Sequence, residues 1–309
     1  MVDLRGDLGR IYASIGVAID RPNIVLKATY APELETSGPR AERTRKFAEA
    51  ILDHYGVETG VKIDVTSDIP EHSGFGSGTQ LALAVGTALS ELFSLDLHPD
   101  EIALKLNRSQ RSAIGTYAFM HGGFIVDGGH KTEKRDGIPP LLFRFDIPPD
   151  WRFVIGLPKI PQKWSGEVED KTFQDVKLPS RDLGGCISRV LLLQMIPALL
   201  EKDIQSFGAA MTSIDRMFGE YWSESQGGVF SHPVIQSCVE FLLENGAHGV
   251  GQSSWGPTLY GIVEGESEAQ NIAEKLEGYL NTGGSEGGAF VVRPNNRGAE
   301  VEVTKSSEK

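Results

Sequence analysis

The sequence lacks the features that mark several common classes of protein. Only two cysteines occur among 309 residues, Cys186 and Cys238. Both lie in apolar stretches with helical spacing, so we expect two buried thiols in a reducing compartment. Basic residues are outnumbered, with 30 Lys and Arg against 42 Asp and Glu, and the net charge of −12 argues against an extended nucleic-acid-binding surface. We recognise no signal peptide and no long apolar span, which predicts a cytoplasmic protein.

Familiar catalytic and nucleotide-binding motifs are also missing. No Gly-Lys-Ser/Thr sequence occurs, so the chain has no P-loop. Gly74, Gly76 and Gly78 alternate and therefore lack the spacing of the dinucleotide-binding fingerprint. The histidines are scattered, with neither a zinc-binding spacing nor a Ser/His/Asp order. The chemistry must therefore come from another kind of site.

The most informative stretch is the glycine-rich segment 69–80, between an alternating apolar run at 61–67 and a long apolar segment that begins at Leu81. This order predicts a strand, a loop and a helix capped by Ser77 or Thr79. The free N–H groups and the dipole at such a helix start form an anion site, most often for phosphate. The alternative is a plain tight turn that binds nothing, because short glycine motifs often occur by chance.

The rest of the chain alternates predicted strands and helices, which indicates a two-layer α+β fold. The sequence Ile147-Pro148-Pro149-Asp150 is typical of a hinge, so we predict an N-terminal domain at 1–148, a C-terminal domain at 149–303 and a disordered tail at 304–309. The predicted helices include 39–54, 79–93, 183–201, 204–222, 233–244 and 266–280. The charges on the helix at 39–54 are expected to form a solvated face.

Three glycine-containing regions together resemble the β-ribofuranosylaminobenzene 5′-phosphate synthases of the GHMP kinase superfamily. They are residues 72–81 (HSGFGSGTQL), residues 111–116 (RSAIGT) with 122–129 (GGFIVDGG), and residues 251–258 (GQSSWGPT). Residues 6–10 and 16–18 and the loop at 165–167 are similar as well, so the resemblance covers nearly the whole chain. It implies a GHMP kinase-like two-domain fold, with an N-terminal domain like domain 2 of ribosomal protein S5 and a ferredoxin-like C-terminal domain.

The resemblance also implies a reaction. Members of that family condense 5-phosphoribosyl 1-diphosphate with 4-aminobenzoate and release carbon dioxide and diphosphate, an early step of tetrahydromethanopterin synthesis. Mg²⁺ and a homodimer are implied in the same way. The residues leave open whether the acceptor is 4-aminobenzoate or 4-hydroxybenzoate, which differ by one polar group. Members usually carry a further strand before the turn at 6–10, whereas this sequence begins almost on the turn, so no N-terminal site residue is carried over.

Two other functions stay open at this stage. One is an ATP-dependent small-molecule kinase of the same fold. Many GHMP kinases have a catalytic aspartate in the middle motif, but the corresponding positions here are Thr116 and Tyr117, and neither supplies a carboxylate. The other is a non-catalytic protein that binds a phosphorylated metabolite.

The candidate site residues follow from the chemistry of this transfer, which needs electrostatic stabilisation and positioning. Backbone amides of Gly74, Gly76, Ser77, Gly78 and Thr79 are predicted to hold one phosphate group. Arg108 or Arg111, with Ser112 beside them, is predicted to bind a second phosphate, because a guanidinium group fits phosphate oxygens in pairs, and Arg111 is also a catalytic candidate.

The remaining candidates each have a structural alternative. Asp127 is predicted to act in catalysis or to bind Mg²⁺, or else it is a turn aspartate at a strand end. Glu167 is a weaker metal candidate, and a surface loop is the simpler interpretation for it. Gln252, Ser253 and Ser254 are predicted to donate hydrogen bonds to the acceptor carboxylate or to a phosphate. Trp255 is predicted to stack on the aromatic acceptor, unless it only packs a turn.

Overall fold

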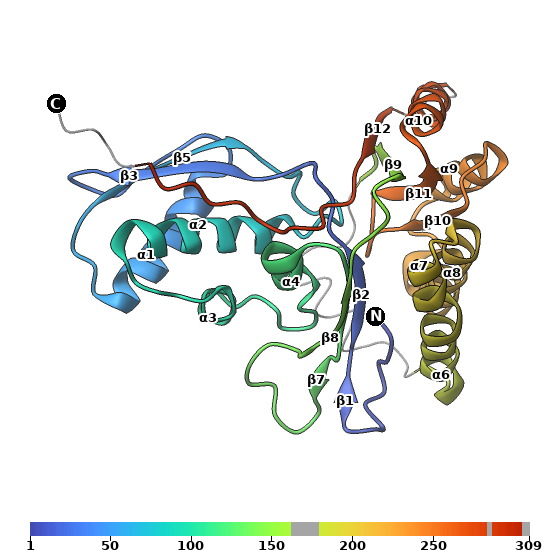
Figure 1. The fold of residues 1–309 in the computed structure, drawn as a ribbon, viewed down its shortest axis with the longest axis horizontal. Helices are drawn as coiled ribbons and strands as arrows, with labels where there is room; N and C mark the ends of the chain where they lie inside the picture. The colour runs from blue at the N-terminus through green and yellow to red at the C-terminus, as the bar shows by residue number, and fades with distance from the viewer. Residues whose placement is uncertain (162–178, 283–285, 305–309) are drawn as a thin grey trace.

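The computed structural model describes residues 1–161, 179–282 and 286–304. These residues form two halves that meet along the middle of the molecule (Figure 1). The N-terminal strands are β1 (Arg10–Ile11), β2 (Ser14–Val17), β3 (Val25–Tyr30), β4 (Glu35–Ser37), β5 (Val61–Ser67), β6 (Phe124–Asp127), β7 (His130–Lys131) and β8 (Leu141–Phe145). The helices among them are α1 (Ala41–Tyr55), α2 (Ser77–Phe93), α3 (Pro99–Lys105) and α4 (Ile114–His121). The predicted α+β fold class is confirmed.

The C-terminal half is built on one four-stranded antiparallel sheet. Its strands are β9 (Trp151–Pro158), β10 (Gly249–Gln252), β11 (Leu259–Glu264) and β12 (Gly287–Val292), in the spatial order β10-β11-β9-β12. The helices are α6 (Arg181–Val190), the π-helical turn η1 (Leu191–Met195), α7 (Ile196–Glu201), α8 (Ile204–Gln226), α9 (Pro233–Glu244) and α10 (Glu266–Leu280). With β9 first and β12 last in the chain, this order is that of a ferredoxin-like domain.

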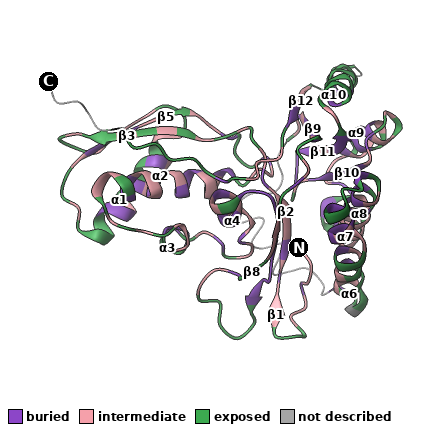
Figure 2. Ribbon diagram, in the orientation of Figure 1, coloured by how far each residue is buried: buried purple, intermediate pink, exposed green. Residues whose placement is uncertain are grey.

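Buried residues occur in the elements of each half and also where the two halves meet (Figure 2). One cluster joins α1, α2 and α3 to β5 in the N-terminal half, and another packs α9 and α10 on β9 and β11. A third cluster joins β6 to α7, α8 and β9, and in it the ring of Phe207 contacts the rings of both Phe124 and Trp151. The halves are therefore coupled by apolar burial, which favours a fixed relative placement.

The last described segment leaves the C-terminal sheet and returns to the N-terminal half (Figure 1). The backbone N–H of Asn295 donates to Ala18, and that of Ala299 donates to Phe119. Residues 293–304 thus pack on N-terminal elements, although the predicted domain boundary assigns 149–303 to the C-terminal domain. Of the predicted tail 304–309, only Thr304 lies within the described residues.

The stretch from Gly249 to Gln252 forms β10, because β11 supplies hydrogen-bonding partners that the glycine-rich sequence alone does not reveal. Two sequence-based expectations need correction. Cys238 is buried as expected, whereas Cys186 is exposed on the outer face of α6. The predicted side-chain cap of α2 is absent, since its N-cap residue is Gly76.

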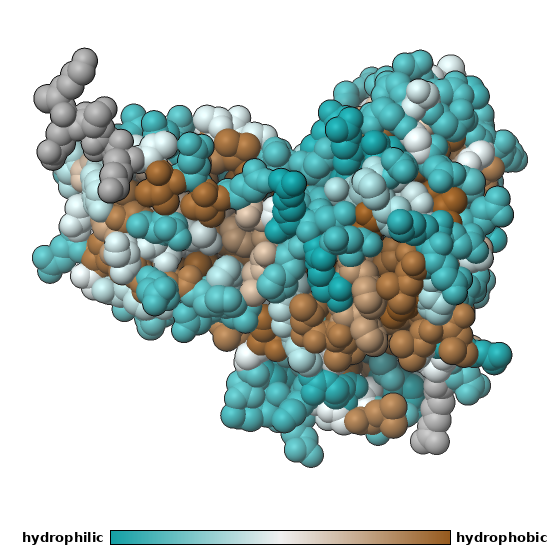
Figure 3. All heavy atoms as spheres, viewed as in Figure 1, coloured by the Kyte–Doolittle hydropathy of each residue, from teal (hydrophilic) through white to brown (hydrophobic). Residues whose placement is uncertain are grey.

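Within the described part of the chain, one helical stretch is long and apolar, at Asp182–Glu201. This stretch is long enough and apolar enough to cross a membrane. Core helices of soluble proteins can have the same length and composition, so the property alone is weak evidence for a membrane span. Its exposed side chains include Leu192, Leu193 and Leu200. Figure 3 shows apolar side chains on the surface over the region of α6 to α8.

Candidate active site

A large cavity of about 2180 Å³ lies where the two halves meet. The N-terminal half contributes the glycine loop and the segment 107–115, and the C-terminal half contributes α8 and the residues after β10. Typical ligand pockets measure about 300–1,000 Å³, so this cavity has room for two substrates side by side. Of the candidates from the sequence, Gly74, Gly76, Thr79, Arg108, Arg111, Ser112, Gln252, Ser253, Ser254 and Trp255 line it.

The glycine loop leads directly into the first turn of α2. Gly76 has φ +68°, a left-handed conformation that favours glycine, and no protein atom lies within 4 Å of where its Cβ would stand. Its carbonyl accepts the N–H groups of Thr79 and Gln80. The N–H groups of Ser77 and Gly78 have no acceptor within the helix, so they remain available to an anion in the open space above Gly76.

Two arginine side chains lie over this helix start. A Cβ on Gly78 would stand 3.0 Å from Nη2 of Arg43 and 3.3 Å from Nη1 of Arg108. Both guanidinium groups also lie against the Phe47 ring, at 5.7 and 5.8 Å from its centroid. Burial and the charge of Arg43 lower the pKa of Arg108. Two close cations at a helix N-terminus make a strong site for a multiply charged anion.

Sequence reasoning missed Arg43, because the charges of the helix at 39–54 were expected to form a solvated face. Only the tertiary structure reveals the position of Arg43. Helix α1 packs along α2, and this packing brings Arg43 to the start of α2 although it lies 35 residues before Gly78 in the chain. Arg108 was predicted as a candidate for a second phosphate, and the structure places its guanidinium group at the start of α2 beside Arg43.

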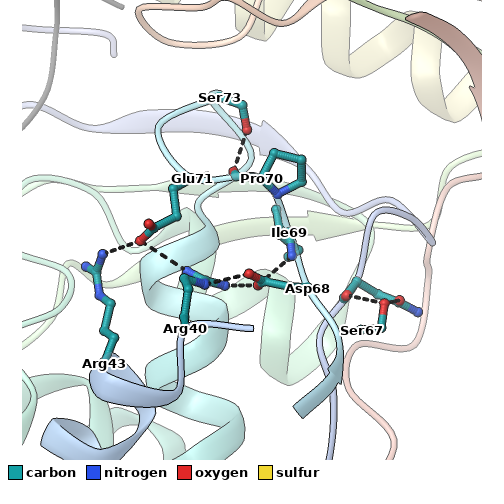
Figure 4. A network of polar contacts seen from close by, with 9 residues as sticks. Arg40, Arg43, Ser67, Asp68, Ile69, Pro70, Glu71 and Ser73 are labelled. Atoms are coloured by element: carbon teal, nitrogen blue, oxygen red, sulfur yellow. Dashed lines mark hydrogen bonds and ion pairs between the residues drawn. The ribbon is translucent and has the colours of Figure 1, made fainter. Parts of the chain in front are cut away.

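Arginine and acidic side chains also hold the loop from below (Figure 4). Arg40 pairs with Asp68, and Arg43 Nη1 lies 2.7 Å from Glu71 Oε1. The hydroxyl of Ser73 donates to the carbonyl of Pro70 over 2.6 Å. These contacts fix the loop before any ligand binds, which reduces the entropy that binding must offset.

Asp127 lies at the end of β6, where the sequence left a catalytic or metal-binding role and a structural role open. Its side chain is fully buried, and its oxygens accept the N–H groups of Ser14, Ala113 and Gly129 and the hydroxyl of Ser112. Burial raises its pKa, while these hydrogen bonds act to lower it. With four donors on two oxygens, this carboxylate joins three chain segments and is poorly placed to bind a metal ion or a substrate. Its geometry favours the structural alternative.

The segment after β10 touches both the glycine loop and the C-terminal half. Ser253 Oγ donates to the carbonyl of Gly74 over 2.7 Å, and a Cβ on Gly74 would stand 2.4 Å from the Ser253 carbonyl oxygen. The Gln252 side chain is occupied, because its oxygen accepts from Ser231 and its amide donates to the Ser254 carbonyl. Gln252 therefore shapes the loop, while the exposed Ser254 remains open to the cavity.

Aromatic side chains and one acidic residue form the wall supplied by α8. The rings of Trp222 and Trp255 are packed edge to face, with their centroids 4.7 Å apart, and Phe218 lies in the same cluster. Asp215 stands one turn before Phe218 on the same helix face and also lines the cavity. Sequence reasoning missed Asp215, since a single aspartate in an amphipathic helix carries no motif.

The metal prediction receives no support from the ligand geometry. Among the described residues, no group of three or more His, Cys, Asp or Glu side chains is arranged to hold a metal ion. Glu167 lies outside the described residues. Asp127 does not fit a Mg²⁺ ligand, for the reason given above.

Comparison with known proteins identifies the family. The GHMP kinases N terminal domain matches residues 42–123, and the GHMP kinases C terminal domain matches residues 195–282. The β-ribofuranosylphenol 5′-phosphate synthase of Archaeoglobus fulgidus is 35% identical over 98% of this chain and 96% of its own length. The chain belongs to this synthase family. The synthase of the same name from Methanothermobacter thermautotrophicus is 32% identical and covers 95% of both chains.

The synthase fold is that of the kinases. A homoserine kinase from Cytophaga hutchinsonii superposes with a TM-score of 0.71 over 96% of this chain and 92% of its own, at 17% identity, which shows the fold alone. At the positions where many GHMP kinases have a catalytic aspartate, this chain has two side chains that are engaged in internal hydrogen bonds. Thr116 is buried and its hydroxyl is hydrogen-bonded to that of Ser109, and the Tyr117 hydroxyl donates to the Pro139 carbonyl. The family resemblance read from the glycine motifs is confirmed.

Proposed function

We propose that this protein condenses 5-phosphoribosyl 1-diphosphate with 4-hydroxybenzoate and releases carbon dioxide and diphosphate. One observation carries the proposal: a single cavity extends from Gly76, Thr79 and Arg108 at the start of α2 to an aromatic wall that includes Trp255. One end suits a phosphorylated sugar and the other an aromatic acid. The reaction is that of a decarboxylating pentosyltransferase, the enzyme class of its synthase relatives.

The choice between the two possible acceptors rests on the names of the relatives. The curated relatives from Archaeoglobus fulgidus and Methanothermobacter thermautotrophicus are named for a ribofuranosylphenol product, which requires a hydroxyl group on the ring. We therefore favour 4-hydroxybenzoate over 4-aminobenzoate, the two acceptors that the sequence leaves open.

The anion end of the cavity stabilises the charge that leaves the sugar. As the bond from the anomeric carbon to diphosphate lengthens, negative charge grows on the diphosphate and positive charge on the ribose ring. Fixed N–H groups of Ser77 and Gly78 and the guanidinium groups of Arg43 and Arg108 meet that negative charge without reorganising. Arg111, which lines the same cavity, is proposed to contact the second phosphate.

Further properties of the family are part of the proposal. Mg²⁺ is proposed to accompany the diphosphate of the donor, an arrangement that needs only one or two protein carboxylates. A homodimer, a cytoplasmic location and a role in tetrahydromethanopterin synthesis are proposed by analogy with the family.

The test is one set of incubations with carboxyl-labelled acceptor. We expect carbon dioxide, diphosphate and the ribosylated phenol in equal amounts when phosphoribosyl diphosphate and 4-hydroxybenzoate are both present, and nothing when either is omitted. We expect no ATP consumption above background with small alcohols, since Thr116 and Tyr117 offer no carboxylate base. Phosphorylation of an alcohol without carbon dioxide release would establish the kinase alternative, and binding of the donor without turnover would establish the regulator.

Arg108→Ala is expected to raise KM for phosphoribosyl diphosphate by about 10- to 150-fold. A charge-assisted hydrogen bond to phosphate contributes about 1.5–3 kcal/mol, and that contact is made only to the donor. KM for the aromatic acid should change little. Steady-state kinetics with each substrate varied in turn measure both. Arg45→Ala is the matched control, because Arg45 lies on the same helix as Arg43 but is exposed and pairs with Glu49. Equal effects of Arg108→Ala on both substrates would assign Arg108 to folding.

A further inference from the structure

We propose that Asp215 is the general base that accepts the ring hydroxyl proton of the acceptor as the carbon–carbon bond forms. The inference deepens the proposed function and rests on it. It arises from where Asp215 lies: in the cavity wall, beside the aromatic cluster, with one carboxylate oxygen held and the other not.

The carboxylate is fixed by two neighbouring strands. Asp215 Oδ2 accepts the backbone N–H of Gln252 over 2.6 Å and the hydroxyl of Tyr260 over 3.0 Å. Among the described residues, no hydrogen bond reaches Oδ1, and the side chain is partly accessible from the cavity. A held oxygen and an open one are what a positioned base needs, since the open oxygen can meet a substrate hydroxyl at hydrogen-bond distance.

A glycine makes this approach possible. A Cβ on Gly251 would stand 1.7 Å from Asp215 Oδ2 and 2.5 Å from the Tyr260 hydroxyl oxygen. Any side chain there would push the carboxylate off the strand. Gly251 is the first residue of the 251–258 motif. A glycine is needed at this position because the Asp215 carboxylate occupies the space that a side chain would fill.

The base and the phosphate site are joined by two consecutive residues. Gln252 donates its N–H to Asp215, and Ser253 donates its hydroxyl to Gly74 in the glycine loop. Phe218, one helical turn after Asp215, and Trp255 provide apolar ring contacts between the two. An aromatic acid on this wall is thus placed with its hydroxyl toward Asp215 and its carboxylate-bearing carbon toward the bound sugar.

The chemistry needs a base at that position. The ring carbon that bears the carboxylate forms a bond to C1′ of the ribose, and the bond from C1′ to diphosphate breaks. The hydroxyl proton passes to Asp215, so the ring becomes a neutral dienone instead of a protonated ketone. Loss of carbon dioxide then returns its bonding electron pair to the ring, and Asp215 gives the proton back to the oxygen. Atoms and charge balance with no further reactant.

The surroundings of Asp215 suit both halves of that proton transfer. Burial raises its pKa to about 7, although the hydrogen bonds from Tyr260 and from the Gln252 N–H lower it, as does the Met1 amino group nearby. The pKa of that amino group is itself lowered to about 6 by burial. Burial and Asp215 raise the pKa of Tyr260, so Tyr260 stays a neutral donor. A carboxyl group that titrates near neutral pH can accept a proton and return it.

The test compares acceptors of different hydroxyl acidity in the Asp215→Asn variant. We expect the rate of carbon dioxide release from 4-hydroxybenzoate to fall by about 10²- to 10⁴-fold, the usual contribution of a general base, with KM for the donor unchanged. With 3,5-difluoro-4-hydroxybenzoate, whose hydroxyl is already largely ionised at neutral pH, the loss should be at least ten times smaller. In the wild type, the rate with 4-hydroxybenzoate should fall below about pH 7, and Asp215→Asn should remove that dependence.

A second variant protects the test against misfolding. Tyr260→Phe removes a hydrogen bond that lowers the pKa of Asp215, so it should move the acid limb of the rate profile to higher pH. Equal losses with both acceptors, or an unmoved acid limb in Tyr260→Phe, would overturn the role of Asp215. An inactive wild type with every acceptor would instead overturn the proposed function.

Discussion

Gly76→Val is expected to abolish donor binding and turnover while leaving a folded protein. No protein atom lies within 4 Å of the new Cβ, so the side chain fills the open space above the start of α2 where the phosphate group is proposed to lie. The backbone at φ +68° adds strain of about 1–2 kcal/mol, which a protein of this size tolerates. Thermal unfolding paired with titration of phosphoribosyl diphosphate measures both effects.

Gly56→Val is the matched control for this experiment. Gly56 ends α1 at φ +64°, and no atom lies within 4 Å of its Cβ position either, so it carries the same backbone strain. It does not line the cavity. We expect the two variants to lose similar stability and only Gly76→Val to lose donor binding. A folded Gly76→Val protein that binds the donor normally would remove the loop from the active site.

Asp127→Ala is expected to cause the largest loss of stability, about 4 kcal/mol or more. It leaves the buried N–H groups of Ser14, Ala113 and Gly129 without an acceptor, and each unsatisfied group costs about 1–3 kcal/mol. At about 2–4 °C per kcal/mol for a chain of this size or somewhat smaller, Tm should fall by roughly 8–16 °C. Differential scanning calorimetry, or loss of cooperative unfolding at ambient temperature, provides the measurement.

Asp53→Ala is the control, because Asp53 is exposed near the end of α1 and should change stability by no more than about 0.5 kcal/mol. The metal hypothesis predicts a different result for Asp127→Ala. A variant with the Tm of the wild type and a selective loss of Mg²⁺-dependent activity would make Asp127 a metal ligand after all.

The sequence determined the elements that local pattern controls. Alternating apolar residues predicted β5, and helical spacing predicted α9 and α10 within the bounds observed. The glycine residues and the apolar run after them predicted the loop and the helix α2, because positive φ at Gly74 and Gly76 depends on the residues themselves. The combination of three short motifs was enough to identify the synthase family, which the full-length relatives confirm.

The tertiary structure decided what each polar side chain does. Asp127 and Gln252 looked like ligand residues in the sequence, but hydrogen bonds within the protein occupy their polar atoms, from Ser14 and Ala113 to Asp127 and from Ser231 to Gln252 among them. Arg43 looked like part of a solvated face, but the packing of α1 on α2 brings its guanidinium group to the start of α2. Asp215 had no motif at all. Its environment depends on β10 and β11, which lie more than 30 residues further along the chain and reach it only when the sheet has formed.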